Sequence, residues 1–310
     1  MKKLIGKMVV FVIPILLCAL FVLYIDPFNY FSLLTGIPEG IKKETVSNFN
    51  DVLWYTIDYA HAPSPGIIIG DSRSKRISVE HLREKTGRQY KHLCGNAVKI
   101  NEIVDFFWFA NSYKKLESVY IVLTFSIYNL YAFANRVVGA EAAIKNPLLY
   151  VFDRHVIEAS YLVFSSVFLK RNISLWEPPA SKEEFWKWSL DNWSNQQYGK
   201  WKYPLNGYKG LRDISDYCRQ NHIELTFIIA PNHTDFQAKV DYFNLNGEQI
   251  RFKKDISALS TTYDFDYVND LTKNKDNFSD PVHVTEEVAN SLVDEILTGN
   301  LHYGRLLTNP

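Results

Sequence analysis

Apolar residues recur along most of this chain in two different patterns. Short runs rich in β-branched residues predict buried strands, and longer segments with an apolar residue at about every third or fourth position predict amphipathic helices. The expected strands cover about 66–70, 89–93, 118–123, 224–230 and 264–268. The expected helices cover about 78–86, 100–116, 208–221 and 245–260, with a last helix after Thr285. Strands that alternate with helices predict an α/β fold, a three-layer α/β/α sandwich with a mostly parallel sheet.

The N-terminus carries the longest apolar run of the chain. Met8 to Ile25 is uncharged; three lysines precede it and Asp26 follows it. A run of this length is just able to span a bilayer, and the lysines favour a cytoplasmic N-terminus. A cleaved signal peptide is the alternative, but no pair of small residues marks a cleavage site after the run. We therefore expect one transmembrane anchor at 1–26, in the cell membrane, with the rest of the chain outside the cytoplasm.

Two further segments follow the expected anchor. Proline and glycine break the segment 27–62, which predicts an irregular juxtamembrane stalk. Residues 63–310 form the expected α/β domain. Within it, about 125–205 departs from the strand and helix alternation and holds five of the seven tryptophans, so we expect an aromatic-rich helical insertion on the sheet. Such residues suit sugar stacking, lipid headgroups or a partner protein, and they suit core packing as well.

Composition narrows the functions that this chain can have. Lys and Arg total 34, as do Asp and Glu, so the basic surface that nucleic-acid binding requires is not expected. The three cysteines and eight histidines show neither Cys-x-x-Cys nor His-Glu-x-x-His spacing, so we expect no metal and no cofactor. We expect Cys94 and Cys218 to be small core residues. The sequence does not decide whether they form a disulfide.

Candidate chemistry stands at two places far apart in the sequence. Gly70-Asp71-Ser72-Arg73 follows the first strand, where a serine hydroxyl is exposed and its backbone N–H can face an oxyanion. Asp280-Pro281-Val282-His283 stands just before the last helix. A serine needs a base in contact to become a nucleophile, and a carboxylate can fix the tautomer of that base. We therefore expect Ser72 as nucleophile, His283 as base and Asp280 as the residue that orients the base.

The two blocks together resemble the SGNH (GDSL-like) superfamily of esterases and acyltransferases. The resemblance covers roughly 63–298, with a variable middle. It is closest to the membrane-anchored branch associated with cell-envelope O-acylation, AlgJ/AlgX-like or DltD-like, and the segment from Tyr208 to His233 supports that likeness. The resemblance implies an SGNH-like fold, an acyl-serine intermediate and a multi-span membrane O-acyltransferase as partner.

The resemblance also implies donors for the oxyanion. The N–H of Ser72 is one, and a glycine after the second strand is another; Gly95 is our choice, with the adjacent Asn96 as the alternative. The third donor is usually an asparagine after the third strand. This chain reads Thr-Phe-Ser-Ile-Tyr-Asn there, so Asn129 is the nearest substitute. Arg73 either binds an anionic or sugar group of the substrate or serves as a structural ion-pair partner.

Two functions follow as hypotheses. The first is an extracytoplasmic serine-dependent O-acyltransferase or esterase that acts on a cell-envelope polysaccharide or polymer through an acyl-Ser72 intermediate. The second is a non-catalytic accessory protein that recruits substrate to a multi-span membrane O-acyltransferase. The intact set of Ser72, Asp280 and His283 favours the enzyme. His233 follows the strand at 224–230, where it either lines the cleft or is a plain loop histidine.

Overall fold

The computed structural model describes residues 2–308 apart from 33–35, 47–48, 132 and 172–180, with side chains from residue 10 onwards. The chain divides into two compact units. A helical unit combines Met1–His61 with Arg136–Glu177, and a sheet unit combines Ala62–Asn135 with Pro178–Pro310. Both candidate motifs lie in the sheet unit.

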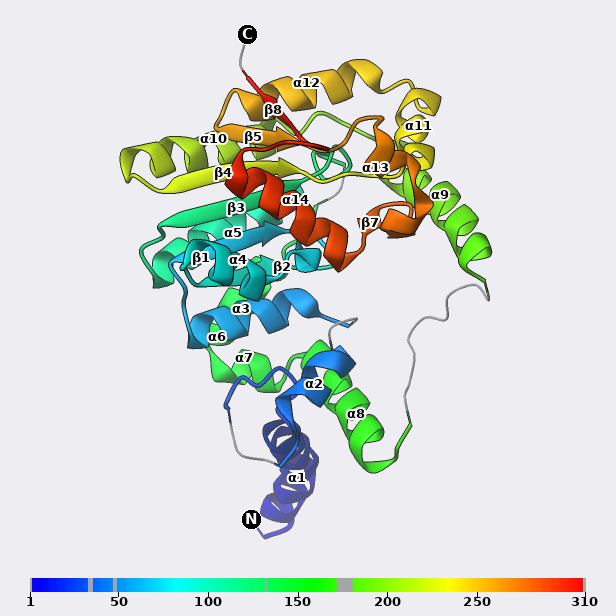
Figure 1. The fold of residues 1–310 in the computed structure, drawn as a ribbon. Helices are drawn as coiled ribbons and strands as arrows, with labels where there is room; N and C mark the ends of the chain where they lie inside the picture. The colour runs from blue at the N-terminus through cyan, green and yellow to red at the C-terminus, as the bar shows by residue number, and fades with distance from the viewer. Residues whose placement is uncertain (1, 33–35, 47–48, 132, 172–180, 309–310) are drawn as a thin grey trace. The chain divides into compact units, whose positions relative to one another are not determined.

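The sheet unit is built on six strands in the order β2-β1-β3-β4-β5-β8 (Figure 1). The strands are β1 (Gly66–Gly70), β2 (Tyr90–Cys94), β3 (Ser118–Leu123), β4 (Glu224–Ile229), β5 (Thr261–Asp264) and β8 (Arg305–Leu307). Neighbours from β2 to β5 pair in parallel, and β8 runs antiparallel to β5. The mostly parallel sheet expected from the sequence is therefore confirmed.

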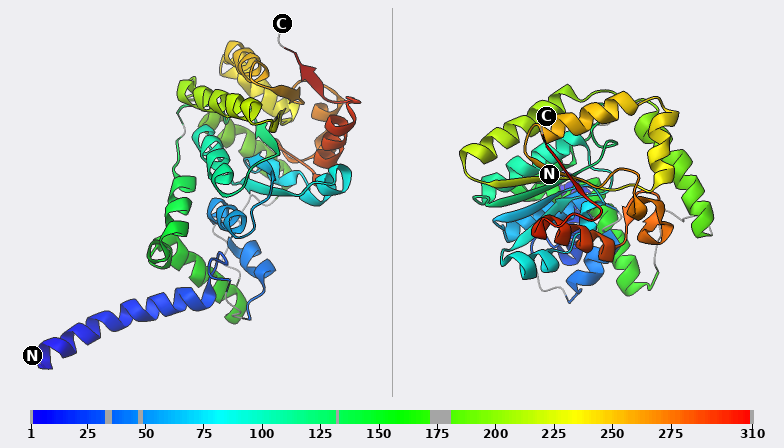
Figure 2. Two further views of the ribbon diagram at one scale, coloured as in Figure 1. Left: turned by 90° about the vertical axis from the view of Figure 1, so that its left-hand side faces the viewer. Right: turned by 45° about the horizontal axis from the view of Figure 1, so that its top comes forward.

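Helices cover both faces of this sheet (Figure 2). One face carries α4 (Val79–Thr86) and α14 (Glu286–Thr298), whose apolar residues share a core with β1, β3 and β4. The other face carries α5 (Ile100–Tyr113) and α10 (Leu205–Gln220), which also contact each other. Two glycines of α10 allow that close approach. A Cβ at Gly207 would lie 2.6 Å from the side chain of Ile100, and one at Gly210 would lie 2.7 Å from Val104.

Local signals for the helix ends are confirmed. The Ser78 hydroxyl accepts from the backbone N–H of His81 at the start of α4, and Gly87 ends that helix with a φ of 71°. Thr285 accepts from the N–H of Val288 at the start of α14. Each end therefore uses a residue within one helical turn, which is why the sequence showed it.

Among the elements that differ from the expectation are a shifted strand and an additional helix. The strand expected at 264–268 is β5 at Thr261–Asp264. It ends there because the Asp264 carboxylate accepts from the N–H of Asp266 at 3.0 Å and turns the chain. A helix not expected from the sequence, α11 (Thr234–Tyr242), follows β4. Only Phe236 and Val240 of α11 are buried, so its apolar stripe is short.

The sheet unit contains several further helices and turns. They include α9 (Lys182–Tyr198), α12 (Asn246–Ser257), α13 (Asp270–Lys273), and the 3-10 turns η1 (Ser74–Arg76) and η2 (Lys275–Asn277). A two-stranded antiparallel hairpin, β6 (Phe278–Asp280) and β7 (His283–Val284), connects them to α14. Both halves of the Asp280–His283 motif are thus carried by one hairpin.

The helical unit consists of six described helices around one apolar cluster. They are α1 (Lys2–Ile25), α2 (Glu39–Val46), α3 (Asp51–His61), α6 (Arg136–Lys145), α7 (Pro147–Val151) and α8 (Arg154–Phe168). Trp54 and Ile57 of α3 pack in that cluster with Ala140 and Ala143 of α6. The buried Asp26 carboxylate accepts from the N–H groups of residues 30 and 31 and from the Tyr150 hydroxyl at 3.1 Å.

Two expectations for these segments need correction. The segment 27–62 is not an irregular stalk, because it contains α2 and α3; Pro38 stands just before α2, where a proline starts a helix rather than breaking one. The segment 125–205 is not a single insertion on the sheet, because 136–177 belongs to the helical unit. Among the residues that the structure describes, no helix combines the length and the apolar character that crossing a membrane requires.

Candidate active site

Ser72 lies on a tight turn that leaves β1. The backbone carbonyl of Asp71 accepts from the Ser74 N–H at 3.0 Å and from the Ser74 hydroxyl at 2.7 Å. Gly70 has no room for a side chain, because a Cβ there would lie 2.7 Å from the Ser74 Cβ and 3.0 Å from the Val122 Cβ. The glycine of the motif therefore lets the turn close over β3, with Ser72 on its outer side.

This turn stands at the point of the sheet where the strand order changes direction. From β1 the chain moves to β2 on one side, whereas β3 and the later strands lie on the other. Gly70 pairs with Cys94 at the end of β2, and Ile69 pairs with Ile121 of β3. Open parallel sheets bind ligands outside the carboxyl ends of their strands at such a point. Ser72 thus occupies the position where the topology favours a ligand site.

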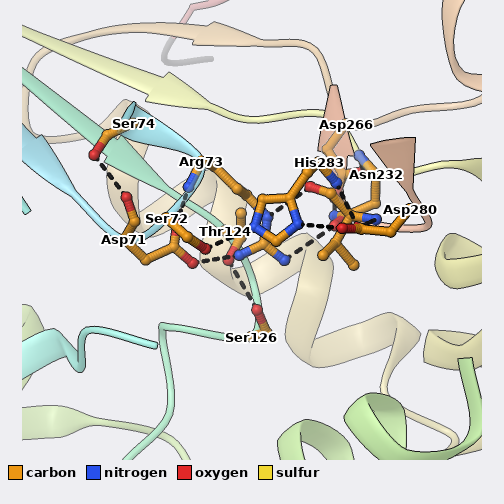
Figure 3. Close-up of polar contacts among 11 residues, drawn as sticks. Asp71, Ser72, Arg73, Ser74, Thr124, Ser126, Asn232, Asp266, Asp280 and His283 are labelled. Atoms are coloured by element: carbon orange, nitrogen blue, oxygen red, sulfur yellow. Dashed lines mark hydrogen bonds and ion pairs between the residues drawn. The ribbon is translucent and has the colours of Figure 1, made fainter. Parts of the chain in front are cut away.

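Three side chains from the two motifs meet at this edge (Figure 3). The Ser72 Oγ lies 2.7 Å from the Nε2 of His283. The Nδ1 of the same ring lies 2.7 Å from the Oδ2 of Asp280. Both distances are within the range expected for a nucleophile, its base and the group that orients the base. Residues 211 positions apart in the sequence are therefore in direct contact.

Asp280 is held by the hairpin that carries it. Its Oδ1 accepts from the N–H groups of Val282 and His283, both at 3.0 Å. Burial alone would raise the pKa of Asp280, but the hydrogen bond and charge of His283, together with the two amides, outweigh burial and lower that pKa. The carboxylate is thus ionised at neutral pH, with one oxygen fixing its loop and the other facing the imidazole.

An ionised Asp280 selects the tautomer of His283. The carboxylate can only accept a hydrogen bond, so the ring proton of a neutral His283 sits on Nδ1. The Nε2 is then the acceptor for the Ser72 hydroxyl. The arrangement can move a proton from serine to histidine while Asp280 stabilises the imidazolium that forms.

The Arg73 side chain is buried and forms hydrogen bonds with other residues of the protein. It is 7% exposed. The guanidinium donates to the Asp71 carboxylate, to the Val282 carbonyl at 3.1 Å through Nε, and to the Asn232 side chain at 3.3 Å. Of the two roles that the sequence left open, these contacts favour the structural one. Arg73 ties the serine turn to the residue that precedes His283.

Gly95 and Asn96 differ in their placement. Gly95 is buried directly after β2, whose last residue pairs with Gly70, so its backbone lies at the same sheet edge as the turn of Ser72. Asn96 is exposed, and its Oδ1 accepts from the Lys75 side chain at 2.9 Å. Gly95 therefore stays the better placed of the two candidate oxyanion donors.

Asn129, the expected third oxyanion donor, joins two segments through hydrogen bonds of its side chain. Its Nδ2 donates to the carbonyl of Gln197 at 2.8 Å. Its Oδ1 accepts from the N–H groups of Tyr131 at 3.0 Å and Lys202 at 3.1 Å. The side chain thus joins the loop after β3 to the end of α9.

Two hydroxyl groups that the sequence did not single out lie in the loop after β3. Thr124 follows β3 directly, and its hydroxyl lies 2.8 Å from the hydroxyl of Ser126. The pairing of β1 with β3 brings this loop beside the turn of Ser72, and Figure 3 draws both residues with the triad. Their only sequence signal is a polar pair at the end of a buried strand.

His233 is buried and binds the hairpin through its backbone, rather than lining a cleft. It is 3% exposed, and its backbone N–H donates to the carbonyl of Pro281 at 2.9 Å. Its Nδ1 accepts from the N–H of Asp235 at the start of α11, and its Nε2 faces the Lys273 carbonyl at 3.3 Å. Burial lowers the pKa of His233, against the opposing effect of Asp235. His233 is therefore a neutral capping residue.

An aromatic side chain that the sequence did not single out stands beside the base. The Trp193 ring of α9 lies 6.2 Å from the His283 ring, at an interplanar angle of 88°. α9 also contacts β6, the first strand of the hairpin. No motif signals this contact, because it depends on how α9 packs against an element about 85 residues further along the chain.

Comparisons with known proteins yield no family. No model of a known protein family matches the chain, and no curated protein matches it. Among solved structures, a Streptococcus pneumoniae protein provisionally described as a platelet activating factor aligns with a TM-score of 0.40 at 9% identity, over 84% of this chain and 96% of that one. A Bacteroides fragilis protein provisionally described as an acylhydrolase aligns with a TM-score of 0.40 at 12% identity, over 80% and 96%. These scores are too low to assign a fold or an activity.

Proposed function

We propose that this protein is a serine-dependent esterase or O-acyltransferase of SGNH-like type. The observation that carries the proposal is the chain of contacts from Ser72 Oγ to His283 Nε2 and from His283 Nδ1 to Asp280, each of 2.7 Å. The placement of this chain at the point where the strand order changes direction supports a ligand site there. A serine with only a structural role and a histidine on the surface would not be expected to share this geometry.

The proposed reaction has two halves. The Ser72 Oγ attacks the carbonyl carbon of an ester while its proton passes to His283 Nε2. The bond between the carbonyl carbon and the leaving alcohol then breaks, and the alcohol takes the proton from His283. In the second half, water or an acceptor hydroxyl gives its proton to His283 and attacks the acyl-Ser72 ester. Ser72 regains the proton as the free acid or the new ester leaves.

Developing negative charge in both halves needs hydrogen-bond donors. The N–H groups of Ser72 and Gly95 are our candidates, because both residues follow strands that end at this edge. The hydroxyls of Thr124 and Ser126 are further candidates in the loop after β3. Such donors act on charge that forms only in the transition state, so their removal lowers kcat.

The acceptor, the partner and the location stay predictions from the sequence. They are a cell-envelope polysaccharide or polymer, a multi-span membrane O-acyltransferase, and a position outside the cytoplasm with lipid contacts through the N-terminal residues. Extraction of membranes with alkaline carbonate and N-terminal sequencing of the mature protein test the location. A mature protein that begins after residue 26 would show cleavage in place of an anchor.

The decisive experiment is covalent labelling of Ser72. A fluorophosphonate probe should label the wild-type protein and fail to label Ser72→Ala and His283→Ala, because only an activated serine attacks phosphorus at a useful rate. Ser291→Ala, at an exposed serine of α14, serves as the matched control. Peptide mapping should place the adduct on Ser72. An unlabelled, folded wild-type protein would reject covalent catalysis and favour the non-catalytic accessory role.

A further inference from the structure

Three aromatic side chains on α9 form a surface beside the candidate triad. We call Phe185, Trp188 and Trp193 the aromatic wall. The Phe185 and Trp188 rings lie 6.1 Å apart and nearly parallel, at 19°. The Trp193 ring stands almost perpendicular to both, at 86° and 81°, with centroids 5.8 and 6.1 Å away. The three rings thus present two aromatic surfaces at a right angle.

One residue of the aromatic wall is in contact with the candidate base. Trp193 contacts the His283 ring edge to face, and His283 contacts Ser72. An ester whose carbonyl carbon sits at Ser72 must therefore carry its neighbouring groups close to Trp193. The occupant of the wall is accordingly part of the molecule on which Ser72 acts.

Other residues of α9 hold this helix against α11. Trp186 is buried, its Nε1 donates to the Asp235 carboxylate at 2.9 Å, and its ring lies 4.8 Å from that of His233. Asp191 pairs with Lys239 of α11 at 3.1 Å. α9 is thus fixed to α11, so the wall does not have to be ordered when a ligand binds.

The character of the wall distinguishes a sugar from a long acyl chain. All three rings are half-buried, and exposed polar residues such as Lys187 and Asp191 flank them on α9. A long acyl chain gains most from an apolar cavity that removes its whole length from water. The cavity lined by Arg73, Val122 and the apolar residues of α14 has a volume of about 30 Å³, which is too small for a long acyl chain. A pyranose ring has one apolar C–H face and polar edges, which match half-buried aromatic rings flanked by polar residues.

We propose that the aromatic wall stacks a pyranose ring of a carbohydrate substrate, next to the ester that Ser72 attacks. This inference rests on the proposed function for its reaction, although the binding itself does not require catalysis. Trp193 is the central residue, because it alone of the three is in contact with His283 among the described residues. Phe185 and Trp188 extend the surface away from the triad.

The kinetic test compares two esters. One is O-acetylated chitotriose, and the other is p-nitrophenyl acetate, which has the same acyl group and no sugar. Trp193→Ala should lower the ratio of their kcat/KM values roughly five- to tenfold, mainly through a higher KM for the sugar ester, because an aromatic contact contributes about 1 kcal/mol. Trp193→Phe should restore part of the ratio. Trp108→Ala, which removes a partly exposed tryptophan of α5, is the matched control.

Two kinetic outcomes would contradict sugar stacking on the aromatic wall. An equal loss for both esters would make Trp193 a support of His283 only, and a larger loss for p-nitrophenyl dodecanoate than for the sugar ester would make the wall an acyl-chain site. A binding measurement separates this inference from the proposed function. Ser72→Ala protein should bind chitohexaose in calorimetry, and Ser72→Ala/Trp193→Ala protein should bind it roughly five- to tenfold more weakly. Equal affinity would reject the wall even if catalysis is confirmed.

Discussion

Asp280 uses its two oxygen atoms for two different tasks. One oxygen closes the hairpin on the amides of Val282 and His283, and the other faces the imidazole. The residue therefore supports both the position of the base and its tautomer. Loss of its charge and loss of its side chain are expected to have different consequences.

Asp280→Asn tests the tautomer. The Asn oxygen can still accept the hairpin amides, but its Nδ2 donates to His283 and places the ring proton on Nε2, where it opposes proton transfer from Ser72. We expect kcat for ester hydrolysis to fall by a factor on the order of 10⁴, with a nearly unchanged melting temperature. Measurement of kcat together with thermal unfolding checks this. A loss of activity that merely follows a loss of fold would contradict the assigned role.

His233 provides a test through pH. Its lowered pKa in the native protein means that the unfolded chain takes up a proton first as the pH falls below about 6.5. The unfolded state then binds more protons than the native state, so the free energy of unfolding decreases with falling pH, by at most about 1.4 kcal/mol per pH unit for one site. The decrease ends where the native His233 itself becomes protonated.

Denaturant unfolding of wild type and His233→Asn at several pH values measures this effect. Asn keeps an acceptor for the N–H of Asp235 at the start of α11, and it does not titrate. The variant should therefore show a flatter pH dependence between about pH 6.5 and 5. Parallel pH profiles of the two proteins would show that His233 contributes no linkage.

At the scale of elements, the site depends on how closely the turn after β1 approaches β3. We expect Gly70→Ala to push the turn outward, because the new methyl group has no room beside Ser74 and Val122. Stability should fall by about 2 kcal/mol, and kcat/KM should fall on the order of 100-fold. Gly247→Ala in α12 is the control, since a Cβ there meets nothing within 4 Å. Equal behaviour of the two variants in unfolding and activity assays would disprove the crowding.

At the scale of the whole sheet unit, one buried carboxylate joins three elements. Asp264 of β5 is fully buried and pairs with Lys253 of α12 at 2.9 Å and with Arg305 of β8 at 2.6 Å. The antiparallel edge strand is therefore fixed to the parallel strands by charge as well as by backbone pairing. Lys253 also donates to the carbonyl of Asp266, which places the pair beside the end of β5.

Asp264→Asn should destabilise the sheet unit. The substitution removes the buried carboxylate that pairs with the largely buried Lys253, which costs about 3 kcal/mol. Asp191→Asn, at an exposed pair with Lys239, should change the free energy of unfolding by less than about 1 kcal/mol. Urea unfolding of both variants makes the comparison. A loss in Asp264→Asn no larger than in Asp191→Asn would show that the pair adds nothing to stability.

The sequence by itself determined the features that depend on neighbouring residues. Strand and helix periods indicated the parallel sheet, and Ser78, Gly87 and Thr285 marked helix ends that the structure contains. The two short motifs indicated Ser72, Asp280 and His283, because serine, carboxylate and imidazole chemistry is recognisable from a few residues.

Only the tertiary structure decided what depends on residues far apart in the chain. It showed that 27–62 and 136–177 pack in one helical unit, that Arg73 and Asn129 are used in internal hydrogen bonds, and that Trp193 stands beside His283. The physical reason is the same in each case. The partner of a buried polar or aromatic side chain is set by the packing of whole elements, and a local pattern of apolar and polar positions carries no record of it.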